Sequence, residues 1–568
     1  MFKTAWVLVL VTALIAPISA GVRQTPVSKS AVAELPGADP LPLVAHTERP
    51  RVYDVEHYDI DLRFDIDTQS VDGTTSVRLA PLSDGFRVLE LDAGDLDVAS
   101  VRLANGPDLP FTVDDTREKL AVTLDRDYTK GEPLTVTVRY TATPKRGLYF
   151  FKQGDPPKSE PAQFWSQGET NDNHYWFPCW DEPNDKATSD LVMTIDQKFA
   201  GLSNGELVDS RANGDGTRTL HWRQSRPNAA YLIMVAGGDF AEIHDSWRGR
   251  PVTYFVPRDK AQFARATFGR TPRMLEYFTR KIGIDYPWPK YSQIVLGHFM
   301  FGGMENTSAT TLEDTMLLDT PTETADVADN LVAHELAHQW WGDLVTCRDW
   351  SHAWLNEGFA TYFDLLWTEH ARGTAAFRAR IRDTVREHIR STASRSRPLV
   401  YNVYRAPFDL FFDGVLYPKG ALVLHMLRYV VGDVAFWRGL KLYGTRNAYG
   451  IVTTGDFQSA MEEASGQKLG WFFDEWTAKA GYPEFELSST WDPVTKFVEV
   501  RVRQVQAVTD LVPVFRMPVD IQIATRRGAR IERVMVDAKE NVYRFRSATA
   551  PTGITIDPHD WLLKVVDE

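Results

Sequence analysis

Apolar and polar residues alternate with a period of two along residues 46–242, for example in the segments 58–64 and 134–140. Alternation of this kind is typical of strands that bury one face and expose the other. Sheets with one solvated face are usually antiparallel. The pattern therefore predicts a mostly antiparallel N-terminal β domain over residues 46–242.

The hydrophobic period changes to that of a helix between residues 243 and 480. Apolar positions with helical spacing and few clusters of β-branched residues occur in three segments, 375–389, 419–431 and 457–464. Such spacing is typical of amphipathic helices packed against a core. Residues 243–480 are therefore predicted to form a mostly helical domain.

A Gly-Tyr-Pro sequence at residues 481–483 ends the helical region, and alternation returns after it in four short segments, 485–487, 497–502, 519–523 and 533–536. Short alternating strands with turn residues between them predict a small C-terminal β-sandwich over residues 484–568. A chain of 568 residues is also too long for one core. The expected fold class is a multidomain α+β protein.

The N-terminus has the pattern of an export signal. Lys3 precedes an apolar run over residues 5–18, and Ser19-Ala20 offers a small-residue cleavage site. The run is short for a membrane-spanning helix, which needs about 20 residues. We expect a signal peptide over residues 1–20, a loose proline-containing leader over 21–45, and no transmembrane span in the mature chain. The destination is periplasmic or extracellular, and an uncleaved anchor is the alternative.

Charge and cysteine content exclude some classes of function. The net charge is −13, and no basic run of the kind that binds nucleic acid is present. Cys179 and Cys347 are the only cysteines, too few for a disulfide framework. We expect two buried free thiols, although the sequence allows them to pair. The oligomeric state stays open.

The strongest chemical signal is His334-Glu335-Leu336-Ala337-His338, followed by Glu357. Histidines four residues apart lie on one face of a helix, so both imidazoles can reach one metal ion. Two histidines and a glutamate form the ligand set of thermolysin-like catalytic zinc sites, with the fourth position left for water. Glu335 then stands beside that water as a general base.

The segments around this motif support a packed site. Leu331 and Val332 lead into the motif on an apolar pattern, and residues 354–367 again have helical spacing and carry Glu357. Two helices with a short connection are usually antiparallel neighbours. We therefore expect Glu357 to approach the two histidines and one zinc ion to be bound per chain.

At this point the sequence resembles the zinc aminopeptidases of the aminopeptidase N family, the gluzincin-type M1 peptidases. The resemblance runs from about residue 50 to the end and includes the spacing from His338 to Glu357. Further matching segments are Gly302-Gly303-Met304-Glu305-Asn306, Tyr417-Pro418-Lys419-Gly420-Ala421, Phe177-Pro178-Cys179-Trp180-Asp181-Glu182-Pro183, residues 231–240 and residues 286–291. It implies a thermolysin-like catalytic domain.

The resemblance also implies roles for single residues at the reacting centre. His334, His338 and Glu357 would hold zinc, and Glu335 would act as general base and then acid. Tyr417 would donate a hydrogen bond to the oxyanion, a contact whose loss typically slows a reaction about 100–1000-fold. Tyr401 and Tyr404 are alternative candidates for this donor. Asp364, seven residues after Glu357, is either an acceptor for a ligand histidine or a plain surface carboxylate.

Other residues would bind the substrate. By resemblance Glu305 contacts the free α-amino group, and Glu169 falls where the family places a second amine-binding group. Gly302 and Gly303 would lie along the substrate as extended backbone, and Met304 would line the first side-chain pocket. Buried carboxylates left unpaired by a blocked N-terminus would disfavour such a substrate.

The expected function is therefore an exported zinc aminopeptidase acting on peptides with a free N-terminus. A zinc endopeptidase with the same machinery is one alternative, and a non-catalytic peptide-binding module is another. Many members of the family carry a large helical domain after the sandwich, whereas this sequence stops at Glu568. We expect a more open cleft from that difference.

Overall fold

The computed structural model describes residues 42–104, 106–154, 161–317 and 325–567. The expected signal peptide, and the leader as far as residue 41, lie outside the described residues. Within the rest of the leader, β1 (Val44–Ala45) pairs antiparallel with β22 (Val403–Tyr404). No helix in the described part of the chain has both the length and the apolar character needed to cross a membrane.

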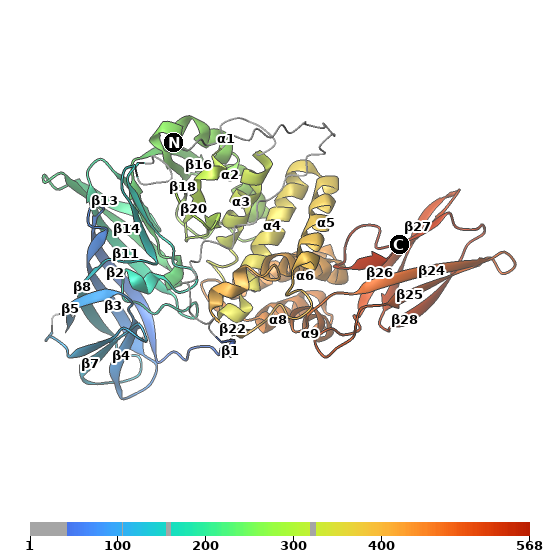
Figure 1. Ribbon diagram of the computed structural model, residues 1–568, viewed down its shortest axis with the longest axis horizontal. Coiled ribbons are helices and arrows are strands. Elements are labelled where there is room, and N and C mark those ends of the chain that lie inside the picture. The colour runs from blue at the N-terminus through green and yellow to red at the C-terminus, as the bar shows by residue number, and fades with distance from the viewer. Residues whose placement is uncertain (1–41, 105, 155–160, 318–324, 568) are drawn as a thin grey trace, which may run out of the picture. The chain divides into compact units, whose positions relative to one another are not determined.

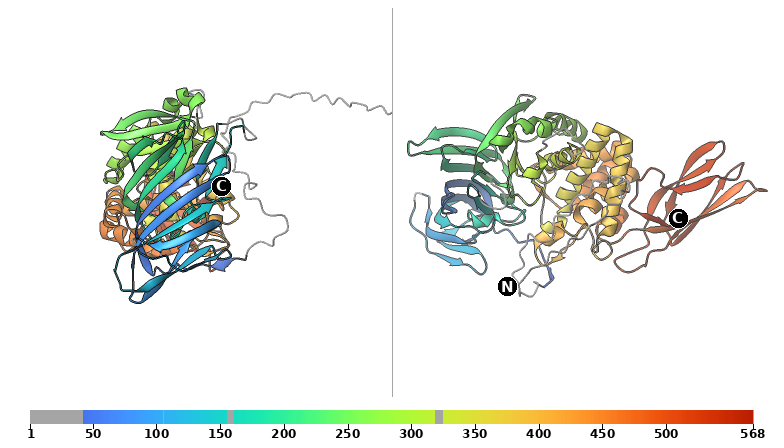
Figure 2. Two further views of the ribbon diagram at one scale, coloured as in Figure 1. Left: turned by 90° about the vertical axis from the view of Figure 1, so that its left-hand side faces the viewer. Right: turned by 45° about the horizontal axis from the view of Figure 1, so that its top comes forward.

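The N-terminal region is built on a seven-stranded sheet (Figure 1; Figure 2, left). Its neighbours are antiparallel except for β2 and β11, which are parallel. Buried residues alternate along β2 as expected, with Tyr58, Ile60 and Leu62 facing the core. In spatial order the strands are β13 (Glu206–Ala212), β14 (Thr217–Asn228), β11 (Ala187–Asp196), β2 (Tyr53–Asp65), β3 (Ser70–Pro81), β8 (Leu134–Ala142) and β5 (Leu96–Leu103).

Two smaller sheets complete this region. One has the order β4 (Phe86–Asp92), β7 (Lys119–Tyr128) and β6 (Phe111–Asp114). The other has the order β12 (Ala200–Ser203), β15 (Val235–Gly238), β10 (Gln163–Ser166) and β9 (Leu148–Phe151). The prediction of a mostly antiparallel N-terminal β region is confirmed.

A five-stranded sheet precedes the main helices and was not expected from the sequence. Its order is β16 (Phe240–Trp247), β17 (Arg250–Pro257), β18 (Tyr291–Leu296), β20 (Ala309–Glu313) and β19 (Gly303–Met304). Every residue of β18 is buried. A strand covered on both faces has no period-two alternation, which explains why the pattern did not indicate it.

The helical region follows the predicted pattern. Each of the three segments with helical spacing lies within one helix, namely α5 (Thr374–Arg390), α6 (Leu416–Val431) and α8 (Thr454–Ser465). The other α-helices are α1 (Ala264–Phe268), α2 (Thr271–Ile282), α3 (Ala325–His338), α4 (Trp354–Arg372), α7 (Asp433–Arg446) and α9 (Gly470–Thr477). Two short strands among these helices, β21 (Thr346–Cys347) and β23 (Ile451–Val452), pair with each other in parallel.

Short 3₁₀ turns connect several of these elements: η1 (Asn173–Tyr175), η2 (Ala230–Leu232), η3 (Arg258–Phe263), η4 (Asp314–Met316), η5 (Trp350–His352) and η6 (Pro407–Phe411).

The C-terminal region consists of two sheets, drawn in red in Figure 2. One has the order β28 (Glu540–Arg546), β25 (Phe497–Gln504), β24 (Glu484–Asp492) and β30 (Val565–Asp567); the other has the order β27 (Gly528–Val536), β26 (Met517–Thr525) and β29 (Gly553–Ile556). Val500 on β25 and Ile521 on β26 are fully buried at the centre of the two sheets. The predicted sandwich is therefore confirmed.

One continuous apolar cluster runs from the N-terminal sheets through the helices to this sandwich. Cys179 and Cys347 both belong to the cluster, and both are buried free thiols, as the sequence analysis expected.

Helices α4 and α6 touch through their backbones at two glycines. A Cβ atom built on Gly358 would lie 2.7 Å from the Cα of Gly420, and the reverse distance is the same. Carbon atoms in contact normally stay about 3.5–4.0 Å apart, so no larger residue fits at either position without movement. Glu357 directly precedes one glycine, and Tyr417 lies three residues before the other. The crossing therefore brings two candidate site residues together.

Replacing Gly420 with alanine should force the two helices apart. Overpacking a close contact typically costs about 1–3 kcal/mol of folding free energy. The G420A variant should consequently have a lower Tm than the parent protein in thermal unfolding followed by circular dichroism. Gly455 in α8 provides a matched control, because an added Cβ there would meet only Thr453 Oγ1 at 3.6 Å. An unchanged Tm in G420A would contradict the role of this contact.

Candidate metal centre

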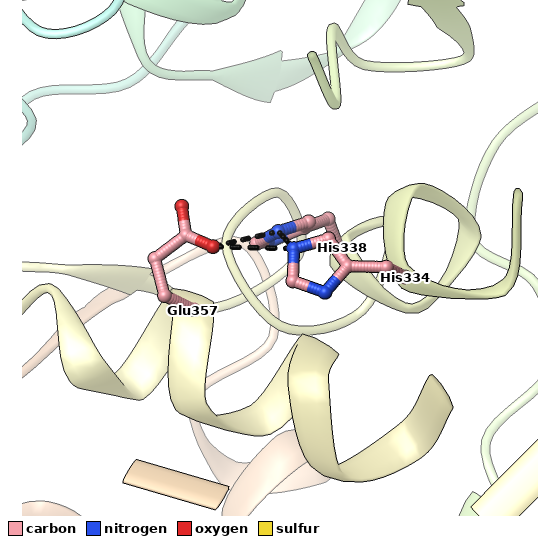
Figure 3. Close-up of side chains that lie close together, drawn as sticks. All are labelled: His334, His338 and Glu357. Carbon is pink, nitrogen blue, oxygen red and sulfur yellow. Dashed lines mark hydrogen bonds and ion pairs between the residues drawn. The ribbon is translucent and has the colours of Figure 1, made fainter. Parts of the chain in front are cut away.

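The two histidines lie in the last turns of α3, and Glu357 lies in the first turn of α4. After α3 the chain reverses direction at Gly342. Its φ of 129° is a conformation that glycine adopts without strain and that other residues rarely adopt. The backbone N–H of Gly342 donates to the carbonyl of Val345 at 2.8 Å. This turn returns the chain so that Glu357 faces the histidines, as the sequence predicted (Figure 3).

The three candidate ligand atoms form a nearly regular triangle. Nε2 of His334 and Nε2 of His338 are 3.1 Å apart, and each is 3.3 Å from Oε2 of Glu357. Ligands at about 2.0–2.1 Å from a tetrahedral zinc ion are separated by about 3.3–3.4 Å. The residues present therefore fit one face of a tetrahedral metal site.

Electrostatics favour a cation at this triangle. The side chain of Glu357 is 3% exposed. Burial by itself would raise its pKa, but the attraction of His338 and the close contacts with both imidazoles lower it to about 2. Buried charges are normally paired or bound to metal. An ionised carboxylate held between two imidazoles is a suitable donor set for a divalent ion.

A backbone contact fixes the orientation of one ligand. Nδ1 of His338 lies 3.0 Å from the carbonyl oxygen of Trp341. Because a carbonyl only accepts, Nδ1 carries the proton and Nε2 presents its lone pair to the triangle. Asp364 does not take this part, since its carboxylate is bound by the guanidinium of Arg380. The interpretation of Asp364 as a histidine acceptor is wrong.

Glu335 lies against the backbone of Gly303. A Cβ atom at residue 303 would be 2.2 Å from Oε1 of Glu335, so any side chain there would displace the carboxylate. Burial, together with the negative charges of Glu305 and Glu357, raises the pKa of Glu335 well above its ordinary value, although His338 opposes the shift. Glu335 thus occupies a desolvated position between α3 and β19.

A second group of carboxylates adjoins the triangle. One oxygen from each of Glu169, Glu305 and Glu357 lies within 4.8 Å of the other two. Oε1 of Glu169 and Oε1 of Glu305 have no hydrogen-bond partner among the described residues. Burial and repulsion from Glu305 raise the pKa of Glu169, and burial also raises that of Glu305. An added cation with hydrogen-bond donors would satisfy both groups.

Gly302, Gly303 and Met304 lie at the edge of the five-stranded sheet. Gly303–Met304 forms β19, which pairs antiparallel with Thr311 and Leu312 of β20 and has no strand on its other side within the described residues. Gly302 has a φ of 79° and open space where a Cβ would lie. Unpaired strand edges accept further extended chains.

Met304 is buried and receives a hydrogen bond on its sulfur from Nε2 of Gln167 at 3.1 Å. Gln167 belongs to the loop that also carries Glu169. The loop is held by Asn173, whose amide donates to the carbonyls of Ala230 and Ile233 at 2.6 and 2.9 Å. Glu169 thus lies in a loop that the buried hydrogen bonds of Gln167 and Asn173 hold in place.

Tyr417 is the tyrosine that faces the metal ligands. Its ring centroid is 6.0 Å from that of His334. Burial and the nearby negative charges, first that of Glu357, raise its pKa well above the ordinary value, so it remains a donor. Tyr404 instead stacks on His46 at 3.9 Å, and Tyr401 lies beside Arg397. The alternatives to Tyr417 are therefore not supported.

Sequence reasoning missed Gln339, which ties α3 to the segment of Glu305. Its side-chain amide donates to the backbone oxygen of Glu305 at 2.9 Å and accepts from the N–H of Ser308 at 2.8 Å. Gln339 is fully buried and directly follows His338. A polar residue next to a buried motif could have indicated such a contact, but nothing in the sequence identified its partners.

Comparison with known proteins gives two family matches. Residues 266–476 match the peptidase family M1 domain, and residues 54–232 match the peptidase M1 N-terminal domain. Aminopeptidase M1-D of Oryza sativa subsp. japonica is 30% identical over 80% of this chain and 52% of its own length. Human glutamyl aminopeptidase is 30% identical over 62% of this chain and 38% of its own length.

The chain thus spans about half the length of the curated relatives it matches, or less. Among solved structures, aminopeptidase A of Legionella pneumophila in complex with aspartic acid superposes with a TM-score of 0.79. That match covers 92% of this chain and 60% of the other at 19% sequence identity, and it supports the fold. From the two family matches and this shared fold, the chain belongs to peptidase family M1.

Proposed function

We propose that this protein is an exported zinc-dependent aminopeptidase that removes N-terminal residues from peptides. The observation that carries the proposal is the ligand triangle of His334, His338 and Glu357, beside which Glu169 and Glu305 each present a carboxylate oxygen without a hydrogen-bond partner. The first group suits zinc, and the second suits the ammonium group of a free N-terminus.

Substrate binding follows from these groups. The α-ammonium group of a peptide donates hydrogen bonds to Glu305 and Glu169 and neutralises their repulsion. The peptide backbone pairs with the free edge of β19 at Gly303 and runs past the adjacent Gly302, while Met304 contacts the first side chain. Zinc, when bound, supplies Lewis-acid chemistry that polarises a carbonyl and acidifies water.

Proton transfer is assigned to Glu335. Its carboxylate takes a proton from the attacking water and later delivers it to the amine of the leaving peptide. Tyr417 donates a hydrogen bond to the oxygen on which negative charge develops. Gly303 leaves the space that the Glu335 carboxylate occupies. Because Glu335 is buried and Tyr417 is partly buried, little bulk water competes for these hydrogen bonds.

The zinc endopeptidase and the non-catalytic peptide-binding module remain the competing functions. The first shares the metal ligands and base but has no use for two carboxylate oxygens without hydrogen-bond partners next to the triangle. The second has no use for Glu335 and Tyr417 at positions facing the ligand set. Both alternatives are therefore less well supported than the aminopeptidase.

Replacing Glu335 with glutamine should remove the base but leave the metal ligands intact. We expect kcat for a peptide with a free N-terminus to fall by about 100–10,000-fold, with one zinc ion retained per chain. Steady-state kinetics and elemental analysis would measure the two quantities. A parent protein that binds zinc stoichiometrically but hydrolyses no peptide of a library would favour the binding module instead.

Replacing Glu305 with glutamine should weaken recognition of the free N-terminus. Loss of a charge-assisted hydrogen bond costs about 1.5–3 kcal/mol, so kcat/KM should fall by about 10–100-fold for a peptide with a free amine. The same peptide with an acetylated N-terminus should be a poor substrate for both proteins. Equal cleavage of the acetylated peptide, with internal fragments in mass spectrometry, would instead identify an endopeptidase.

Export should leave a mature chain that begins near Gly21. The intact mass of protein produced with the full sequence in a bacterial host should correspond to cleavage after Ala20, and the protein should leave the cytoplasm. Substituting Ala20 with a bulky residue should retain the uncleaved form, because signal cleavage needs small residues. Full-length protein confined to the cytoplasm would contradict export.

A further inference from the structure

A second group of potential metal ligands lies on the seven-stranded sheet, outside the site described above. His57 and Asp59 are on β2, and Asp190 is on the neighbouring strand β11, with Asp59 opposite Asp190 in the parallel register (Figure 1). One ligand atom from each of the three residues lies within 4.8 Å of the other two. Tyr58 and Ile60, on either side of Asp59 in β2, are buried in the core. His57 and Asp59 therefore lie on the opposite, outer face of the sheet, and Asp190 lies on the same face because it is opposite Asp59.

The hydrogen bonds around His57 fix which ring nitrogen carries its proton. Its Nδ1 is 2.7 Å from Oγ1 of Thr188. The hydroxyl of Thr188 itself donates to the carbonyl of Glu56 at 3.1 Å. Because that proton is already used, Oγ1 must accept from Nδ1–H of His57. Nε2 of the neutral ring therefore holds a lone pair.

That lone pair faces two carboxylates. Nε2 of His57 is 3.2 Å from Oδ1 of Asp59 and 3.4 Å from Oδ2 of Asp190. Three lone-pair donors at such separations repel one another unless a proton or a metal ion lies between them. The two distances from Nε2 are close to the spacing of about 3.3–3.4 Å between ligands of one tetrahedral zinc ion, and the two carboxylate oxygens lie within 4.8 Å of each other.

The carboxylate of Asp190 is also held in its orientation by contacts on the side away from His57. Oδ1 of Asp190 accepts from Nε of Arg223 at 2.8 Å and is contacted by Nε2 of His221, both on β14. These contacts use one oxygen and leave Oδ2 turned toward His57. Metal-binding histidines and carboxylates typically have such supporting hydrogen bonds. Thr188 supports His57 in the same manner.

We infer that His57, Asp59 and Asp190 form a second site for a divalent transition-metal ion such as Zn²⁺. An imidazole nitrogen and carboxylate oxygens suit zinc and similar ions. The side chain of Asp59 is 61% exposed, so an ion reaches the site directly from solvent. The positive charges of Arg223 and Arg78 oppose binding. Arg78 is itself paired with Glu56, and the two ligand carboxylates outnumber Arg223. Thr188 acts as a positioning residue.

Zinc stoichiometry tests this site. The full chain, freed of metal with a chelator, is titrated with Zn²⁺ against a competing chromophoric chelator. The parent protein should take up two equivalents, H57A should take up one, and H334A/H338A should also take up one. D59N should likewise lose the second equivalent, and it changes an exposed side chain with little risk to folding. H244A alters an exposed histidine of another sheet and should retain two.

Thr188 provides a finer comparison. T188V removes the acceptor for His57 and should weaken the second equivalent by about 10–100-fold, whereas T188S keeps the hydroxyl and should bind like the parent. Circular dichroism would show that each variant is folded.

Uptake of two equivalents that H57A and D59N leave unchanged would overturn the inference. So would uptake of one equivalent that only H334A/H338A abolishes, which would identify His57 as a protonated partner of the two carboxylates. Either result would leave the proposed catalytic function untouched, because that function is tested by the Glu335 and Glu305 variants.

Discussion

Repulsion among buried carboxylates is the constraint on which the centre of this protein depends. Glu305, Glu335 and Glu357 lie within a few ångströms of His338, and all are almost fully buried. Burial and the negative charge of Glu357 raise the pKa of Glu305 and of Glu335, and the opposing effect of His338 does not cancel the shift. Only the pKa of Glu357, which lies against both imidazoles, is lowered. A chain that folds around such a cluster needs cations from outside. Under the proposed function, a metal ion and a substrate ammonium group would satisfy this need at two adjacent points.

The surrounding fold holds that cluster together by close contacts at positions where only glycine fits. Helices α4 and α6 are in contact at Gly358 and Gly420. The carboxylate of Glu335 occupies the space that a side chain at residue 303 would need. Each of these glycines lies within three residues of one that has a chemical assignment. The small residues therefore serve the site by position, since none of them contributes a functional group.

Much of this arrangement could be predicted from the sequence because it depends on local spacing. The ligand histidines are one turn apart in one helix, and Glu357 begins the next helix, so geometry within two elements fixed the triangle. Gln339 could not be assigned, because its partner Glu305 is 34 residues away and is brought close only by tertiary packing. The buried strand β18 also gave no alternation to detect. Asp364 was misinterpreted because helical spacing does not reveal Arg380 on the next helix.

The short edge strand β19 has a further consequence. The backbone edge at Gly303 and the carboxylate of Glu305 are only two positions apart on one rigid segment. A chain paired along that edge advances about 3.3 Å with each residue. Sliding by a single residue would take its terminal amine away from Glu305 or push it into the protein. Under the proposed function, β19 fixes the register of the bound peptide, and each catalytic cycle would remove one amino acid.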